Sequence, residues 1–120
     1  SNYLFNGFYE YRQNEQGGRI LDGSFRIATE YVNDDNNEDV KMSLEGRYEA
    51  GKKDSAFVYK FEFPTAIYTT TLYYEKDSDK CLWGSVIGTG TDSPVSYREE
   101  NPESCTLNYL NRKAGIFEWK

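Results

Sequence analysis

Nucleophilic and acid–base catalysis depend on side chains that this sequence largely lacks. The 120 residues include no histidine, the commonest general base and the commonest transition-metal ligand. Ser24, Ser43 and Ser85 therefore have no imidazole to deprotonate them, and no serine stands in a Gly-x-Ser-x-Gly motif. Cys81 and Cys105 would be reactive only if a neighbour lowered the pKa of the thiol, so burial or pairing is the better interpretation.

Paired carboxylates are the remaining candidates for an enzyme, since glycoside hydrolysis needs two on opposite sides of the scissile bond. The carboxylates within predicted strands are Glu10, Asp22, Glu45, Glu62 and Glu118. All of them occupy the polar positions of an alternating pattern, which indicates a solvated outer face. We therefore expect no catalytic residues and no enzymatic activity.

Two loops have the composition of ligand-binding loops without their spacing. Residues 33–39 are rich in carboxylate and amide oxygens, and Asp77 with Asp79 forms a second acidic cluster. Neither has the Asp-x-Asx-x-Asx-Gly spacing that wraps a chain around Ca²⁺. Gly88-Thr-Gly90 is not followed by the Lys-Ser/Thr pair of a phosphate loop. The sequence thus predicts no metal site and no cofactor.

The charge balance argues against polyanionic partners. Lys and Arg number 14 against 20 Asp and Glu, so the formal net charge is −6, and the basic residues are scattered. Nucleic-acid binding needs a basic stripe that neutralises phosphates, and anionic membrane surfaces attract basic segments. We expect neither nucleic acid nor a membrane as a partner, and no run of 18 apolar residues occurs.

The elements that carry these residues show a hydrophobic period of two. Apolar and polar residues alternate over 21–31, 40–50 and 57–63, as in half-buried antiparallel strands. Further strands are expected at 3–12, 67–75, 81–89, 95–99, 105–110 and 115–120. One helical turn is possible at 99–104. Short turns between successive strands favour an up-and-down meander.

A small glycine motif favours closure of this meander. The pattern apolar-x-Gly-x-apolar recurs around Gly7, Gly23, Gly46 and Gly84, each glycine in the inward series. Glycine within a strand permits a tight bend or a close neighbour, and a strongly curved sheet needs both. We predict an all-β fold, an antiparallel meander closing into a small barrel of about eight strands, with a β-sandwich as the alternative.

The strand rhythm and the segment Gly7-Phe8-Tyr9 resemble calycin-like barrels, the superfold of lipocalins and avidins. Lipocalins carry Gly-x-Trp on the first strand, and Arg112 could be the basic residue that they pack beside it. Tyr9 replaces the tryptophan, and the biotin-site pattern of avidins is absent. The resemblance implies a fold rather than a ligand.

The 20 aromatic residues supply two candidate binding sites. Most belong to the inward series and either fill the barrel or line a ligand cavity, where the hydroxyls of Tyr9, Tyr11, Tyr48 and Tyr59 would orient a polar group. A shorter set is expected on the outer face of two neighbouring strands: Ile67, Tyr73, Trp83 and Ile87. We name these four the outer patch. A contiguous apolar patch with Trp and Tyr is typical of interfaces, unless segment 90–112 covers it.

Three functions follow, in order of preference. The first is a non-catalytic domain that binds a protein partner, or itself, through the outer patch. The second is a lipocalin-like carrier of a small apolar or aromatic ligand. The third is a secreted carbohydrate-binding or inhibitor domain.

Residues 1–120 are expected to form one domain, cut from a longer protein because the chain opens on Ser-Asn. We expect a soluble protein, intracellular rather than secreted, and the absence of an Asn-x-Ser/Thr sequon is compatible with an intracellular or bacterial origin. The alternative is a secreted protein with a Cys81–Cys105 disulfide.

Overall fold

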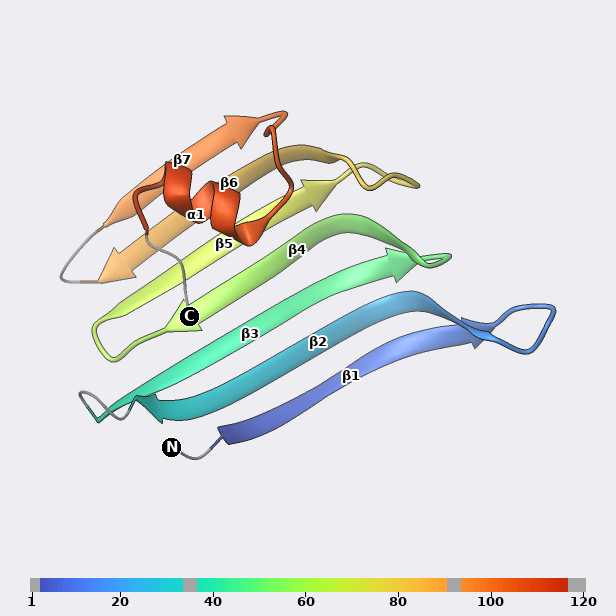
Figure 1. Cartoon of the computed structure of the whole chain (residues 1–120), viewed down its shortest axis with the longest axis horizontal. Coiled ribbons are helices and arrows are strands. Elements are labelled where there is room, and N and C mark those ends of the chain that lie inside the picture. Colours follow the sequence, from blue (N-terminus) through green and yellow to red (C-terminus); the bar gives the residue numbers. More distant parts are fainter. Residues whose placement is uncertain (1–2, 34–36, 91–93, 117–120) are drawn as a thin grey trace.

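Seven strands follow one another in the chain, and each pairs with the next in antiparallel orientation. The computed structural model describes residues 3–33, 37–90 and 94–116. The elements are β1 (Tyr3–Gln13), β2 (Arg19–Asn33), β3 (Glu38–Glu49), β4 (Lys52–Glu62), β5 (Ala66–Tyr74), β6 (Cys81–Gly90), β7 (Val95–Glu100) and α1 (Leu107–Lys113). The prediction of an all-β antiparallel meander is confirmed (Figure 1).

The sheet is not closed, so the predicted barrel of about eight strands is not confirmed. In the described residues β1 pairs with β2 alone and β7 with β6 alone, which leaves two open edges. The sandwich alternative is not seen there either, because all seven strands belong to one sheet. The molecule measures 51 × 36 × 18 Å, and its radius of gyration is 16.0 Å. A compact domain of this length has a radius of about 14 Å, so the fold is a slab.

The prediction of a strand at 105–110 is wrong, because this segment begins α1. The hydroxyl of Thr106 caps the helix by accepting a hydrogen bond of 3.2 Å from the backbone N–H of Tyr109. Arg112 and Lys113 in the last turn suit the negative end of the helix dipole. The expected helical turn at 99–104 is also wrong, since β7 runs to Glu100 and residues 101–106 are irregular.

The last expected strand, 115–120, falls mainly on residues 117–120, which lie outside the described part of the chain. Residues 115 and 116 belong to no strand.

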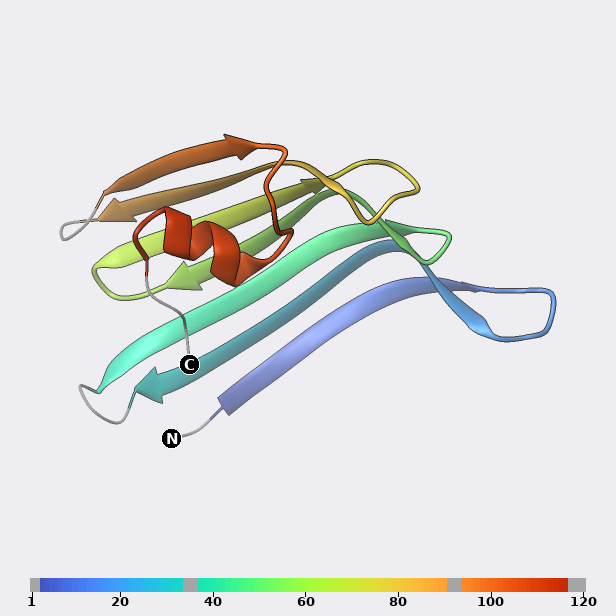
Figure 2. The same ribbon diagram turned by 45° about the horizontal axis from the view of Figure 1, so that its top comes forward.

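The core lies between α1 and strands β4–β6. Figures 1 and 2 show the helix on one face of the sheet, across β5 and β6. The cluster between the helix and the sheet comprises Phe57, Leu72, Tyr74, Cys81, Val86 and Leu110, and none of these residues is more than 2% exposed. We call the face that bears α1 the helix-side face. Because side chains alternate along a strand, Phe25, Ile27, Met42, Leu44, Tyr48 and Tyr59 belong to the same face.

One buried polar contact fixes the helix on the sheet. The hydroxyl of Thr70 in β5 donates a hydrogen bond of 2.6 Å to Oδ1 of Asn111 in α1. Thr70 is 1% exposed and Asn111 is 2% exposed. A buried polar group without its partner costs about 1–3 kcal/mol, so a shift of α1 that broke this bond would be unfavourable.

The inward glycines accommodate neighbouring side chains. A Cβ at Gly46 would lie 2.7 Å from the ring of Phe57, and a Cβ at Gly84 would lie 3.0 Å from Cδ2 of Leu110. Gly7 has the backbone oxygen of Arg26 equally close, at 2.6 Å from an added Cβ. At these positions glycine allows a ring, a helix side chain and a backbone to approach the sheet.

A disulfide joins Cys81, the first residue of β6, to Cys105, which immediately precedes Thr106. The segment leading into α1 is therefore attached covalently to the sheet. This bridge is compatible with the alternative of a secreted protein.

Candidate binding surfaces

The outer patch lies on the face opposite α1. Register pairs Tyr73 with Trp83 and Thr69 with Ile87. The rings of Tyr73 and Trp83 stack with centroids 5.3 Å apart and planes 8° apart. Ile67 is 37% exposed and Ile87 is 51% exposed. The structure thus places all four predicted residues on one face.

Trp83 is already engaged within the patch. Arg98 of β7 lies on its other side, with the guanidinium carbon 4.2 Å from the centre of the indole ring. A cation over tryptophan is a favourable contact, so Tyr73, Trp83 and Arg98 form one stack across three strands. The Thr71–Ser85 pair separates this stack from the isoleucines. The patch therefore offers exposed aliphatic surface at Ile67 and Ile87, and the tryptophan presents mainly its edge.

The four candidate lumen tyrosines line one open face of the sheet. Tyr9 is 50% exposed and Tyr11 is 45% exposed, and Arg19 contacts both: its guanidinium carbon lies 4.4 Å from the Tyr11 ring centre and Nη1 lies 3.2 Å from the Tyr9 hydroxyl. Tyr48 and Tyr59 are half-buried at the border of the core. Burial raises the pKa of the Tyr59 hydroxyl.

A larger apolar surface continues from these tyrosines over the first three strands, on the helix-side face. We define the bare face as Tyr9, Tyr11, Phe25, Ile27, Met42 and Leu44. Apart from the Arg19 side chain on the two tyrosines, no described helix or strand lies over it as α1 lies over β5 and β6 (Figures 1 and 2). Ile27 at its centre is 38% exposed. The alternation of apolar and polar residues predicts that the side chains of the bare face point inward. It does not predict their exposure, which depends on the sheet staying open.

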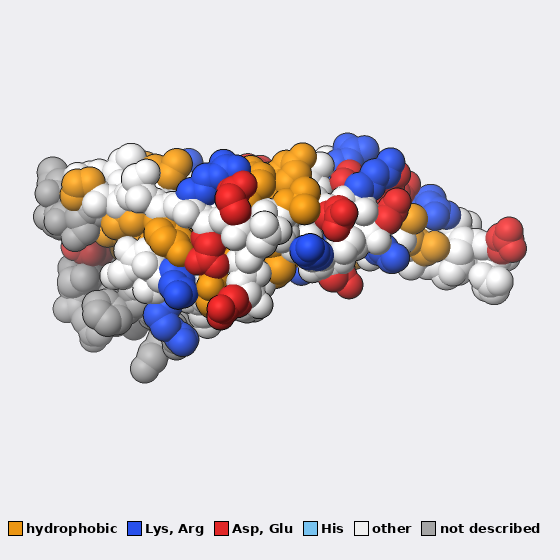
Figure 3. All heavy atoms as spheres, turned by 90° about the horizontal axis from the view of Figure 1, so that it is seen from above, with side chains coloured by type: hydrophobic (Ala, Val, Ile, Leu, Met, Phe, Trp, Pro, Cys, Tyr) orange, Lys and Arg blue, Asp and Glu red, His pale blue; other side chains and the backbone are white. Residues whose placement is uncertain are grey.

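The opposite side of the same strands is charged. Ion pairs run along and across neighbouring strands, with N–O distances of 3.7 Å for Arg12–Asp22, 3.9 Å for Arg26–Glu45 and 3.0 Å for Lys60–Glu62. Glu10, Asp22, Glu45 and Glu62 therefore lie on a solvated face, as predicted, and Glu118 lies outside the described residues. Figure 3, seen from above the β7 edge, shows apolar side chains in small groups between charges of both signs.

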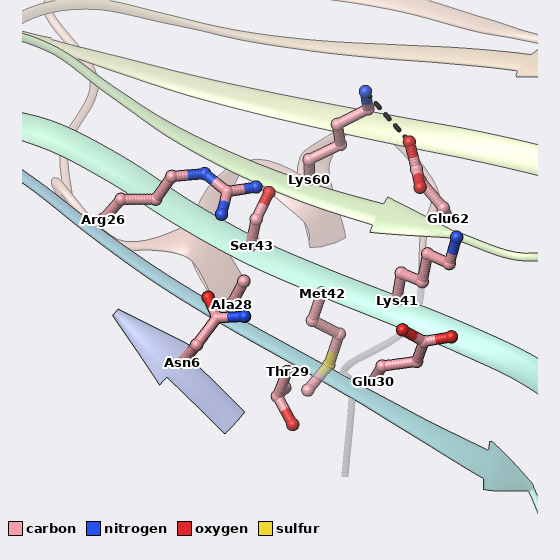
Figure 4. A pocket seen from close by; sticks show the side chains of 10 residues that line it. All are labelled: Asn6, Arg26, Ala28, Thr29, Glu30, Lys41, Met42, Ser43, Lys60 and Glu62. Carbon is pink, nitrogen blue, oxygen red and sulfur yellow. Dashed lines mark ion pairs between the residues drawn. The ribbon is translucent and has the colours of Figure 1, made fainter. Parts of the chain in front are cut away.

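A shallow hollow of about 300 Å³ lies on this charged face. Its lining includes Arg26, Glu30, Lys41, Lys60 and Glu62, and Figure 4 shows Arg26, Ser43 and Lys60 on one side of the sheet with Thr29 and Met42 on the other. The carrier hypothesis expects a cavity of similar size among the tyrosines. None of Tyr9, Tyr11, Tyr48 and Tyr59 belongs to this lining.

A carboxylate joins β7 to α1. Glu99 accepts a hydrogen bond from the hydroxyl of Tyr97 on its own strand and another, of 2.7 Å, from the hydroxyl of Tyr109 in the helix. These bonds hold the pKa of the Glu99 carboxyl below its usual value. The bond to Glu99 raises the pKa of Tyr97 to about 12. The arrangement stabilises the docked helix.

The hydrogen bond between Glu99 and Tyr97 predicts that the stability of the fold falls at both low and high pH. The lowered pKa of Glu99 means that its contribution is present above the ordinary pKa of 4.5 and is lost as the pH falls through the folded-state value. The raised pKa of Tyr97 means that its contribution is present below 10.0 and is lost as the pH rises toward about 12. Urea midpoints measured against pH should show both limits in the parent chain, and Glu99→Gln should flatten the acid limb.

Glu100→Gln is the control, because Glu100 pairs with exposed Arg98 and contacts neither tyrosine in the described structure. It should reproduce the parent curve. If the urea midpoints of the parent chain and of Glu99→Gln fell equally with pH on the acid side, Glu99 would not be the source of the acid dependence.

The fold and surfaces define an all-β domain with one open sheet and one docked helix. No family model matches the chain, and neither a curated protein nor a solved structure matches it. Arg112 lies within α1. In the described part of the chain, no group of three or more acidic or cysteine side chains is placed to hold a metal ion. The described helical segment is too short and too polar to cross a bilayer.

Proposed function

We propose that the chain is a non-catalytic protein-interaction domain that binds a protein partner through the bare face. The observation that carries the proposal is an exposed surface of aromatic and aliphatic side chains, with Arg19 at its tyrosine end, beside a helix that covers β5 and β6. Domains are built from two or more packed layers around a core. Over β1–β3 the second layer is missing among the described residues, and a partner would supply it.

The accessible surface supports this proposal. The chain exposes 7828 Å², whereas a folded monomer of 13.9 kDa exposes about 6,700 Å². The excess is about 1,100 Å², which is more than the roughly 800 Å² that one partner contributes to an interface of standard size. Aromatic side chains held on a sheet lose little conformational entropy on binding and are frequent anchors of interfaces.

Two adjacent residues of β2 provide a matched test. Ile27 points to the bare face and Ala28 to the charged face. A photoreactive benzoylphenylalanine at position 27 should cross-link to a polypeptide that mass spectrometry identifies, in the cells that produce the protein. The same group at position 28 should not. No adduct at position 27, or equal adducts at both positions, would overturn the proposal.

The outer patch is a second candidate surface for the same function. Exposed Ile67 and Ile87 support it, since both belong to neighbouring strands and both point away from α1. The photoreactive group at position 87 addresses it in the same experiment. An adduct at position 87 without one at position 27 would assign the interaction to the outer patch.

A further inference from the structure

We infer that the partner on the bare face is a second copy of this chain, related by a two-fold axis that lies between the two sheets and is parallel to them. This inference rests on the proposed function and names its partner. Three properties of the described residues support it: the stepped profile of the helix-side face, the distribution of charge between the two faces, and the area available.

The helix-side face has a step whose height matches sheet packing. Among the described residues, β5 and β6 carry two layers, sheet and helix, whereas β1–β3 form one layer, except at the end of β3, where Val40 is 1% exposed (Figures 1 and 2). A helix is about 10 Å thick with its side chains, and packed sheets lie about 10 Å apart. A second sheet placed on the bare face would therefore lie level with α1 and beside it. Because the axis is two-fold, the sheet of the first copy fits beside the helix of the second copy in the same way. Each helix then lies next to the β1 edge of the other copy's sheet.

The charge distribution permits this contact between identical acidic chains. The net charge is −6, which would oppose self-association if the carboxylates faced each other. On β2 and β3 the helix-side positions between Leu21 and Tyr31 and between Val40 and Tyr48 carry no charged residue. Asp22, Glu30 and Glu45 occupy the opposite face, where Arg12 and Arg26 pair with two of them. Face-to-face stacking leaves these carboxylates on the outside of the dimer.

The area matches the requirement of a stable dimer. A standard interface buries about 1,600 Å² in total. The excess of about 1,100 Å² belongs to the whole chain, and two copies that buried about 800 Å² of it each would form an interface of this size. An edge-to-edge pairing through β1 would leave the bare face exposed in both copies.

Sedimentation equilibrium on the purified full chain tests the inference. The parent chain should be a dimer, and Ile27→Glu should weaken the dimer at least ten-fold, because each copy would bury an unpaired carboxylate at the interface. Ala28→Glu is the control on the charged face and should remain dimeric. Circular dichroism establishes that each variant is folded; Ile27 is already 38% exposed, so its replacement leaves the helix-covered core unchanged.

A spin-label distance distinguishes stacking from edge pairing. Asn108 is an exposed residue of α1, and with Cys81 and Cys105 bridged, Asn108→Cys supplies one free thiol for the label. With strands about 4.8 Å apart, stacked copies should place the two labels about 30 Å apart, whereas copies joined through their β1 edges should place them about 50 Å apart. The longer distance would overturn the inference.

Two further results separate the inference from the proposed function. A parent chain that stays monomeric while position 27 cross-links to a different protein overturns the second copy and retains the interaction domain. A monomeric chain without an adduct at position 27 overturns both.

Discussion

Gly84→Ala is expected to lower the free energy of unfolding by about 2 kcal/mol, the usual cost of overpacking a filled core. The added methyl group would lie 3.0 Å from Cδ2 of Leu110 and overlap with Cδ1. Leu110 is 0% exposed, and Thr70 and Asn111 hold the helix beside it, so α1 cannot move away without breaking a buried hydrogen bond. Urea denaturation followed by near-ultraviolet circular dichroism measures the loss.

A double-mutant cycle identifies the clash as the cause. Leu110→Ala alone should cost about 3 kcal/mol through the cavity that it leaves. In the Gly84→Ala/Leu110→Ala variant the new methyl group occupies part of that cavity, so the combined loss should be at least about 1 kcal/mol smaller than the sum. Ser85→Ala, on the same strand and the opposite face, should change stability by less than about 0.5 kcal/mol. Additive losses would show that position 84 does not contact the helix.

Reduction of the Cys81–Cys105 bridge is expected to lower the free energy of unfolding by about 3 kcal/mol. The bridge spans 24 residues, and in the chain-entropy model a loop of this length restricts the unfolded ensemble by about that amount. The effect should concentrate on α1, because Cys105 ties the segment before the helix to β6. Urea midpoints with and without reductant, together with amide exchange of residues 107–113, measure both effects.

Cys81→Ala/Cys105→Ala supplies the control for reduction. Its stability should match that of the reduced parent chain approximately, and reductant should not change its midpoint further. A midpoint of the parent chain that is insensitive to reductant would show that the bridge does not contribute to stability.

The alternating pattern was sufficient to predict the sheet, because a half-buried strand places every second side chain against the core. Residues 81–89 and 95–99 were expected as strands and differ from β6 and β7 by one residue each. The helix could not be found by the same criterion. In α1 the buried positions are Leu110 and Asn111, and a polar residue at a core position removes the apolar periodicity by which short helices are recognised. Thr106 was the available signal, since threonine is a common helix cap.

The sequence pattern could not predict that the sheet stays open, for a related reason. Glycines in the inward series have the same spacing whether they bend a sheet toward closure or make room for a neighbour. Here Gly46 accommodates Phe57 and Gly84 accommodates Leu110, and the second contact is non-local because it joins β6 to a helix some 26 residues later. Predicting the outer patch required only the alternation of side chains along two neighbouring strands and the register between them, and its four residues do share a face. The bare face depends on the absence of a covering layer, which alternation does not encode.

The order of the strands has a kinetic consequence for synthesis. Every strand pairs with its neighbour in the chain, so each hairpin closes a short loop and can form quickly. The buried cluster, however, draws on β4–β6 and on Leu110, and Leu110 leaves the ribosome only after the whole sheet. During translation β4–β6 therefore wait as a marginal hairpin array, since a few strands without a packed layer are barely stable in water. We expect the nascent chain to recruit chaperones until α1 emerges, with the apolar helix-side face of β4–β6 as the segment they bind.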